Sequence, residues 1–219
     1  MVDFERARKA MVDNQLRTSN ITDRRLLAVM GQVPRELFVP ADRRSLAYID
    51  DAHALQADRT RRALSAPAPF AKLVQLAGIQ HTDKVLDLGC GTGYSTAVLA
   101  ALAEHVIGVD DKPDLVAQAD SNLQSLGIEN TTIVKGSLEI GVPGHGPFDA
   151  IVVEGVVDAV PEALFGQLAE AGRLVALIRR GATSVANLFV KSGNDVAGRP
   201  EFDASLPPLA EPGGDEFVF

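Results

Sequence analysis

The residues best placed to do chemistry lie in the stretch KVLDLGCGTGYSTAVLA, which begins at Lys84. A short apolar run ends in Asp87, and Gly89, Gly91 and Gly93 follow at alternate positions. Glycines in such a turn let the backbone approach a nucleotide closely. A dinucleotide fingerprint requires G-x-G-x-x-G, but here a tyrosine follows the third glycine, and the Gly-Lys-Ser/Thr of a phosphate-binding loop is missing too. The turn therefore argues against NAD and ATP.

Two acidic residues stand at the ends of successive predicted strands. Asp87 closes the run before the glycine turn, and Asp110 closes the next apolar run, VIGVD. A carboxylate at the carboxyl edge of a parallel sheet repels phosphate and attracts an ammonium group. Asp110 is placed to accept hydrogen bonds from both ribose hydroxyls of a nucleoside. S-adenosylmethionine carries an ammonium, a sulfonium and no phosphate, so the pattern favours this cofactor. The alternative is that Asp87 only caps a helix and the glycines only make a tight turn.

Strands and helices must alternate to position these residues. Short runs rich in β-branched residues predict strands, and helical stretches lie between them. This alternation predicts a doubly wound α/β fold with a mostly parallel sheet covered on both faces. Two final runs with little between them predict an antiparallel pair at one edge. The predicted strands are 84–88, 106–110, 131–135, 148–153, 172–178 and 184–190, and the predicted helices are 69–79, 93–103, 113–126 and 161–169.

The first part of the chain follows a different pattern. Apolar residues at helical spacing predict a helix that begins near residue 4, and Thr22 is placed to cap a second helix that ends near residue 30. The following segment, to about residue 65, is predicted to be irregular because prolines fix two turns in VPRELFVP. We therefore expect an N-terminal helical and loop extension over residues 1–65, contributing to the substrate side, and a cofactor-binding domain over residues 66–219.

The composition excludes several classes of protein. The chain has 219 residues, 46% of them hydrophobic, a formal net charge of −8 and no tryptophan. This acidic balance argues against nucleic-acid and membrane partners. The single cysteine, Cys90, excludes an internal disulfide and suits a reducing compartment. The charged N-terminus lacks a signal-peptide pattern, and no apolar run reaches the roughly 18 residues of a membrane span. A cytoplasmic protein is expected, with no metal site because the four histidines lack ligand spacing.

Segments outside the glycine turn are more specific than the turn. They are the block MVDNQLRTSNITDRRLLAVMGQVPRELFVP, which begins at Met11, and the later runs AYIDDAHAL, LSAP and PFDAIVV. The block is similar to the opening segment of the protein-L-isoaspartate O-methyltransferase family of class I methyltransferases, and the later runs follow in that family's order, so nearly the whole chain resembles this family. The resemblance implies a Rossmann-like sheet of seven strands, of which the seventh is antiparallel. It also implies methyl transfer from S-adenosylmethionine to the free carboxylate of L-isoaspartyl residues in damaged proteins, as a step of protein repair.

The resemblance also implies roles for individual residues. Ser65 matches the hydroxyl residue that lies beside the reacting carboxylate in the family, where it would orient that carboxylate by a hydrogen bond. No strong general base is needed, because a carboxylate with a pKa of about 4 is already ionised near neutral pH. Asp110 matches the family's ribose acid, and Cys90 lies within the glycine turn. The expected cofactor-binding residues are Asp87, Gly89, Cys90, Gly91, Gly93, Asp110 and Ser137.

Three positions depart from the family pattern. The approach to Ser65 reads QADRTRRALSAP instead of a run ending in Gln-Thr-Ile-Ser. Ser137 replaces the family's usual acidic residue, and Glu154 stands where threonine or alanine is commonest. The substrate could therefore differ from the family's, or the protein could bind the cofactor without catalysis.

The arginines in the approach to Ser65 offer positive charge to an anionic substrate. We expect at least one of Arg59, Arg61 and Arg62 to pair with the substrate carboxylate. The alternative is a solvated loop whose arginines all face water.

Overall fold

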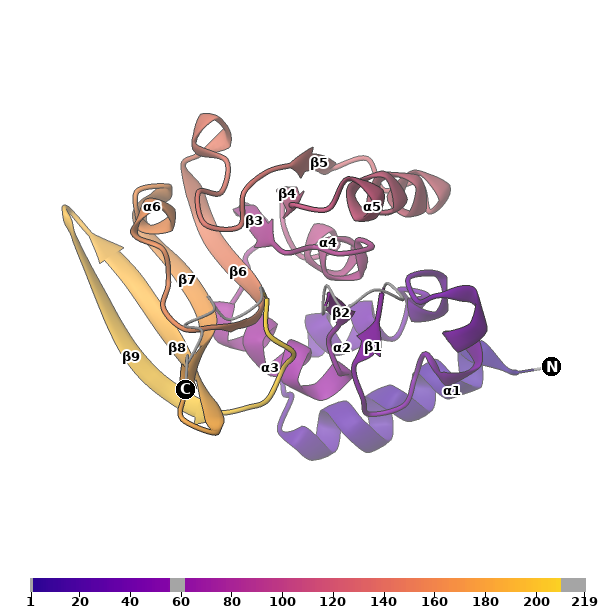
Figure 1. The fold of residues 1–219 in the computed structure, drawn as a ribbon. Helices are drawn as coiled ribbons and strands as arrows, with labels where there is room; N and C mark the ends of the chain where they lie inside the picture. The colour runs from indigo at the N-terminus through magenta and orange to yellow at the C-terminus, as the bar shows by residue number, and fades with distance from the viewer. Residues whose placement is uncertain (1, 56–61, 210–219) are drawn as a thin grey trace, which may run out of the picture.

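A seven-stranded sheet runs through the centre of the protein (Figure 1). The computed structural model describes residues 2–55 and 62–209. The strand order is β5-β4-β3-β6-β7-β8-β9; the pairs from β5 to β7 are parallel, and β8 is antiparallel to both of its neighbours. The predicted α/β class with a mostly parallel seven-stranded sheet is confirmed. The resemblance implied that the seventh strand is antiparallel, whereas the strand that runs against the others is the sixth of the sheet in chain order, β8. The strands are β3 (Lys84–Leu88), β4 (His105–Asp110), β5 (Thr131–Lys135), β6 (Phe148–Val157), β7 (Leu168–Arg180), β8 (Thr183–Ser192) and β9 (Asp195–Asp203).

Helices cover both faces of this sheet. Three of them contact the strands on one face: α3 (Pro67–Ala77) contacts β6 and β7, α4 (Tyr94–Ala100) contacts β3 and β4, and α5 (Pro113–Ser125) contacts β4 and β5. The short α6 (Glu162–Phe165) contacts β7, and its Leu164 belongs to the core cluster of the other face. Proline in the first turn favours the start of α3 and of α5, because a proline there removes no helical hydrogen bond.

The pleat of the central strands sorts their side chains between the two faces. In β3, Val85 packs in the core cluster shared with α3 and α4, whereas Leu86 and Leu88 pack in the cluster of the opposite face. By the same alternation Asp87 lies on the face of Val85. β4 repeats the pattern and ends in Asp110, so both acids lie on one face at the carboxyl edge of the sheet.

The N-terminal residues form a layer of short helices beside α3 and α4 (Figure 1). The second of these helices, α2 (Arg24–Met30), is capped by Asp23 and not by Thr22 as the sequence predicted. One carboxylate oxygen of Asp23 accepts from the backbone N–H groups of Arg25 and Leu26 at 2.8 and 3.2 Å. Thr22 lies one residue too early for such a contact. The other elements here are α1 (Phe4–Met11), a π-helical turn (Val12–Leu16), 3-10 turns at Arg17–Ser19, Arg35–Leu37 and Ala41–Leu46, and the hairpin strands β1 (His53–Ala54) and β2 (Ala63–Leu64).

The C-terminal strands differ from the prediction in two ways. β7 begins at Leu168, inside the predicted helix 161–169, which leaves α6 only four residues. β9 was not predicted at all, so β8 is not the edge strand. The sequence of β9, DVAGRPEFD, is mostly exposed and holds a glycine and a proline, so it carries no apolar alternation. Only its backbone pairing with β8 makes it a strand.

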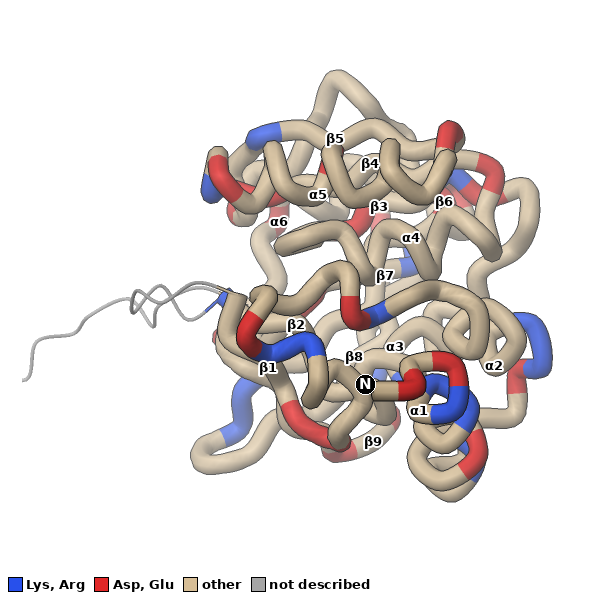
Figure 2. Tube along the Cα trace, turned by 90° about the vertical axis from the view of Figure 1, so that its right-hand side faces the viewer, with Lys and Arg blue, Asp and Glu red and all other residues tan. Residues whose placement is uncertain are grey.

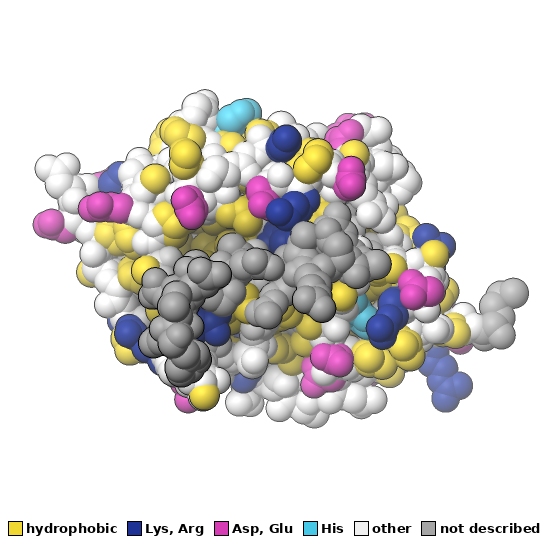
Figure 3. All heavy atoms as spheres, in the orientation of Figure 1, with side chains coloured by type: hydrophobic (Ala, Val, Ile, Leu, Met, Phe, Trp, Pro, Cys, Tyr) yellow, Lys and Arg dark blue, Asp and Glu magenta, His cyan; other side chains and the backbone are white. Residues whose placement is uncertain are grey.

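Charge is spread over the molecule and does not gather on one side (Figure 2). On the face in Figure 3, acidic, basic and apolar side chains are likewise intermixed. Within residues 2–55 and 62–209, no helix is both long and apolar enough to cross a bilayer.

Candidate active site

The glycine turn after β3 depends on backbone conformations that favour glycine. Gly89, Gly91 and Gly93 have φ angles of 90°, 55° and 93°. The backbone N–H groups of Gly89 and Cys90 both donate to the Val109 carbonyl, at 2.8 and 3.0 Å, which binds the turn to β4. A side chain at Gly93 would place its Cβ 3.2 Å from Ala119 Cβ, so the third glycine lets α4 pack closely against α5.

Asp87 holds the start of α4 with one oxygen and leaves the other free. Its Oδ2 accepts from the hydroxyls of Ser95 and Thr96 at 2.7 and 2.6 Å. Its Oδ1 is buried and has no hydrogen-bond partner in the described part of the chain. Burial raises the pKa of Asp87 to about 6; Asp110 adds to the rise, and the two hydroxyls oppose it. An unpartnered carboxylate oxygen in this position fits an incoming ammonium group.

Asp110 is completely buried, and backbone groups fix its carboxylate. Its Oδ2 accepts from the N–H of Gly91 at 2.9 Å, and its Oδ1 accepts from the N–H of Lys112 at 3.1 Å. The Arg62 guanidinium pairs with the same Oδ2. This arrangement joins the acid predicted to bind ribose both to the glycine turn and to the segment before Ser65.

Arg62 is 5% exposed, so it is not an arginine of a solvated loop. Besides its pair with Asp110, its Nη1 donates to the Leu209 carbonyl at 2.8 Å. Neither sequence interpretation anticipated these partners. Arg59 and Arg61, the other two arginines of that hypothesis, lie outside the described residues.

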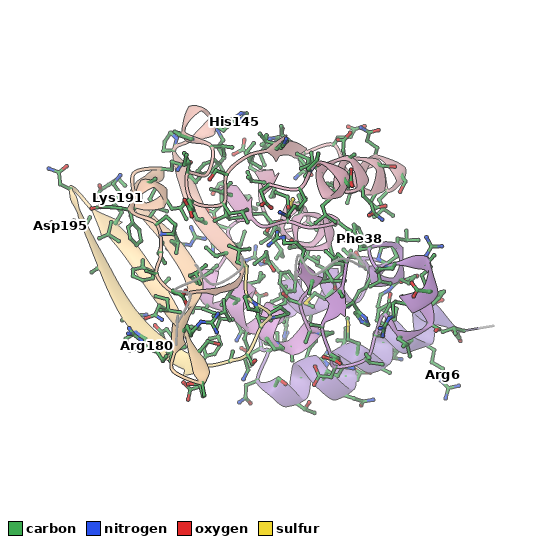
Figure 4. All side chains as sticks on the ribbon, in the orientation of Figure 1. Arg6, Phe38, His145, Arg180, Lys191 and Asp195 are labelled. Atoms are coloured by element: carbon green, nitrogen blue, oxygen red, sulfur yellow. The ribbon has the colours of Figure 1, made fainter. Side chains whose placement is uncertain are left out.

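Ser65 is buried between β2 and α3. Its carbonyl accepts from Arg35 Nη2 at 2.6 Å, and Arg35 Nε donates to the Ala47 carbonyl at 2.7 Å. The guanidinium carbon of Arg35 lies 4.9 Å from the centre of the Tyr94 ring. Phe38, seen beside α4 in Figure 4, packs edge-on against the same ring at 5.6 Å. The N-terminal layer thus holds the backbone of Ser65 in place, and sequence reasoning missed the role of Arg35.

The remaining expected residues lie around the same edge of the sheet. Ser137 is exposed, and its hydroxyl accepts from the N–H groups of Glu139 and Ile140 at 3.2 and 3.3 Å. It follows Gly136, whose N–H donates to the Asp110 carbonyl at 3.0 Å. Burial, strengthened by the two nearby aspartates, raises the pKa of the Cys90 thiol well above its ordinary value. The thiol is therefore protonated and not a nucleophile.

Glu154 stands near the carboxyl end of β6 with a half-buried side chain. Its Oε1 is buried without a partner within the described ranges. Burial, and then the charge of Asp87, raises the pKa of Glu154 well above its ordinary value, and Arg62 and Arg35 oppose the rise.

An apolar cavity of about 170 Å³ opens beside this edge, on the face of the sheet opposite Asp87. Its walls come from the ends of β3, β6 and β7, from the loops after β5 and β6, from α6 and from the C-terminal segment. They include Leu88, Leu138, Val153 and Leu209. The cavity can take a flat apolar group. Leu138 in its wall follows Ser137 directly, so Ser137, one of the expected cofactor-binding residues, lies at its margin.

Comparisons with known proteins show which family the chain resembles in sequence and fold. The family profile of protein-L-isoaspartate(D-aspartate) O-methyltransferases matches residues 6–205. Protein-L-isoaspartate O-methyltransferase 1 of Syntrophobacter fumaroxidans is 39% identical over 175 residues, which are 80% of each chain. A solved protein-L-isoaspartate O-methyltransferase superimposes with a TM-score of 0.78 at 28% identity, over 92% of this chain and 65% of that chain. A Plasmodium falciparum protein, described as a putative enzyme of this kind in complex with S-adenosyl-L-homocysteine, gives a TM-score of 0.76 at 25% identity, over 94% of this chain and 99% of that chain.

Proposed function

The chain belongs to the protein-L-isoaspartate(D-aspartate) O-methyltransferase family, and from this premise we propose how its residues perform the family's reaction. The protein is an S-adenosylmethionine-dependent methyltransferase that acts on L-isoaspartyl residues in damaged proteins. The observation that carries the residue assignment is the buried, unpartnered Oδ1 of Asp87, across the glycine turn from the fixed carboxylate of Asp110.

We assign the cofactor's polar groups to the two aspartates. Asp87 Oδ1 binds the α-ammonium, and Asp110 accepts from the ribose hydroxyls. Gly89, Cys90, Gly91 and Gly93 form the backbone around the cofactor. The apolar cavity beside Leu138 takes the adenine, with Ser137 at its margin. This set matches the cofactor's chemistry because it pairs one carboxylate with the ammonium group and the other with the ribose hydroxyls, and places apolar side chains around the flat ring.

When bound, S-adenosylmethionine would supply an electrophilic methyl group: the ester C–O bond would form as the S–C bond breaks, and S-adenosylhomocysteine would leave as a neutral thioether. The protein provides no base, because the substrate carboxylate is already ionised near neutral pH. Ser65 orients that carboxylate by a hydrogen bond, and Arg35 fixes the backbone that carries Ser65. The surrounding buried side chains exclude water, which favours a reaction in which two opposite charges cancel.

Three further expectations belong to the same proposal. Residues 1–65 contribute the substrate side, and residues 66–219 form the cofactor-binding domain. The substrate is a protein or peptide with an isoaspartyl residue, and no nucleic acid or membrane takes part. The protein works in the cytoplasm, in keeping with its single buried thiol and acidic composition.

Transfer of labelled methyl from S-adenosylmethionine to an isoaspartyl peptide tests this function. The aspartyl peptide of the same sequence is the matched control. We expect labelling of the isoaspartyl peptide alone, and its loss in Asp87→Asn. Equal labelling of both peptides would overturn the substrate assignment, and cofactor binding without any labelling would favour a protein that has lost catalysis.

A further inference from the structure

Side chains of the protein itself lie against the glycine turn. A Cβ added to Gly89 would overlap Leu209 Cδ1 and would lie 3.0 Å from Arg62 Nη2. A Cβ added to Gly91 would lie 2.7 Å from Leu55 Cδ1. The surface assigned to the cofactor is therefore covered from two directions, by the hairpin of β1 and β2 and by the C-terminal segment.

The C-terminal segment is held in this position by backbone hydrogen bonds. The N–H of Leu209 donates to the Val156 carbonyl at 2.9 Å, and the N–H of Val156 donates to the Pro207 carbonyl at 3.0 Å. Figure 1 shows this segment returning from β9 to the end of β6. Because the Leu209 carbonyl also accepts from Arg62, the segment fixes the guanidinium over Asp110.

Arg62 and the cofactor need the same carboxylate. Asp110 Oδ2 accepts from Gly91 and from Arg62, and Oδ1 accepts from Lys112, so little acceptor capacity is left for two ribose hydroxyls while Arg62 is bound. The backbone donors belong to the fold itself, whereas Arg62 is a long side chain that can leave. Ribose binding therefore replaces the Arg62 contact.

We propose that Arg62 is an exchange residue: it covers Asp110 until the cofactor's ribose displaces it, and its freed guanidinium then binds the substrate carboxylate. This inference rests on the proposed function. Because Arg62 is freed only when the ribose binds, the cofactor must bind before the substrate can bind tightly.

The position of Arg62 in the chain suits this second role. Arg62 directly precedes β2, and β2 leads directly into Ser65. The Arg62 carbonyl accepts from the N–H of Leu55 at 2.9 Å, so the hairpin holds its backbone while the side chain moves. Arg35, the other buried guanidinium near Ser65, is already engaged by two backbone carbonyls. Of the two buried guanidinium groups near Ser65 in the described part of the chain, Arg62 is therefore the one that can pair with an anionic substrate.

Glu154 is the rival acceptor for the freed guanidinium. Burial beside Asp87 raises the pKa of Glu154 and favours its neutral form, which attracts a guanidinium less than an ionised substrate carboxylate does. The freed Arg62 guanidinium therefore pairs with the substrate carboxylate and not with Glu154.

The test is to measure two ligands on the same variants. S-adenosylhomocysteine is titrated calorimetrically into the wild-type protein, Arg62→Ala and Arg62→Gln, and the KM for an isoaspartyl peptide is measured at saturating cofactor. Arg44→Ala, which changes an exposed arginine, is the matched control.

We expect Arg62→Ala to bind S-adenosylhomocysteine about tenfold more tightly, because no arginine side chain then has to leave Asp110 before the ribose can bind. We expect its peptide KM to rise about tenfold, the effect of a lost charge-assisted hydrogen bond. Arg62→Gln keeps a hydrogen-bonding side chain over Asp110, so its affinity for S-adenosylhomocysteine and its peptide KM should lie between those of the wild type and of Arg62→Ala.

Opposite effects on the two ligands are a signature that a merely structural role does not produce. Unchanged or weaker S-adenosylhomocysteine binding in both Arg62 variants, with a wild type that binds, would overturn the exchange and leave the proposed function standing. Tighter binding with an unchanged peptide KM would overturn the role in substrate recognition. Absence of binding in the wild type and in every variant would overturn the cofactor assignment, and the exchange with it.

Discussion

Arg62 and Asp110 lie 48 residues apart in the chain and form a buried ion pair, with side chains 5% and 0% exposed. The pair connects the segment before Ser65 to the acid that closes β4. A buried pair of this kind contributes little net stability compared with apolar packing, and breaking it leaves an uncompensated charge. Its placement over the glycine turn couples the substrate-facing segment to the occupancy of the cofactor site.

Asparagine at position 110 should weaken S-adenosylhomocysteine binding. Charge-assisted hydrogen bonds to the ribose are lost, which costs about 1.5–3 kcal/mol. The loss should be larger in an Arg62→Ala background than in the wild type, because in the wild type the substitution also releases a competitor. A double-mutant cycle by calorimetry measures this difference. If Asp110→Asn left the affinity unchanged both in the wild type and in Arg62→Ala, each compared with its own parent, the ribose assignment would be contradicted.

Cofactor affinity should fall as the pH drops below about 6. The pKa of Asp87 is raised to about 6 in the protein, so its carboxylate is mostly ionised above this value and protonated below it. The protonated acid no longer attracts the ammonium group, and the affinity should approach a tenfold loss per pH unit below the pKa. Calorimetric titration of S-adenosylhomocysteine between pH 5 and 7.5 measures the profile.

The control for this profile is Asp87→Asn, which should bind weakly and with little dependence on pH. The charged and titratable groups near Asp87 are Asp110, Arg62, Glu154 and the Cys90 thiol, and the pKa of this thiol is raised well above its ordinary value. Glu154→Gln should therefore keep the wild-type slope. If the pH dependence disappeared in Glu154→Gln and persisted in Asp87→Asn, the titrating carboxylate would be Glu154 and not Asp87.

Alanine at position 65 should slow methyl transfer and leave S-adenosylhomocysteine binding nearly unchanged. The hydroxyl is proposed to orient the substrate only, whereas the backbone carbonyl that Arg35 holds is kept in the variant. A single orienting hydrogen bond is worth about 0.5–1.5 kcal/mol, so the rate should fall roughly 2- to 13-fold. Single-turnover transfer to an isoaspartyl peptide measures it, and a wild-type rate would remove Ser65 from the mechanism.

Alanine at position 23 should destabilise the protein, and alanine at position 22 should not. Asp23 accepts from two backbone N–H groups at the start of α2, and the loss of such a cap costs about 1 kcal/mol of unfolding free energy. The backbone N–H of Thr22 donates to Gln75 Oε1 at 2.7 Å, and this contact survives the substitution. The substitution removes only the exposed and longer contact of the Thr22 hydroxyl with the same oxygen, at 3.5 Å. Urea unfolding of the two variants compares them directly. Equal losses would show that the cap lies elsewhere.

Local signals were sufficient for much of the fold and for placing the carboxylates of the proposed cofactor site at one edge of the sheet. β3, β4 and β5 follow from β-branched apolar runs, whose periodicity depends only on near neighbours. Glycines that adopt positive φ and aspartates that end strands are also local features, so Asp87, Gly91 and Asp110 could be identified without a structure. β9 could not be identified, because its pairing with β8 involves backbone groups that carry no sequence pattern.

The sequence by itself therefore determined the α/β class, the two strand-end carboxylates that we propose for the cofactor, and the resemblance that indicated the reaction. Only the tertiary structure decided what covers them. Arg62 and Leu209 are 147 residues apart, and their hydrogen bond depends on the return of the C-terminal segment to β6. The partner of a charged side chain is set by the path of the backbone through space. No spacing in the chain encodes that path, so the contact between Arg62 and Asp110 became visible only in the folded protein.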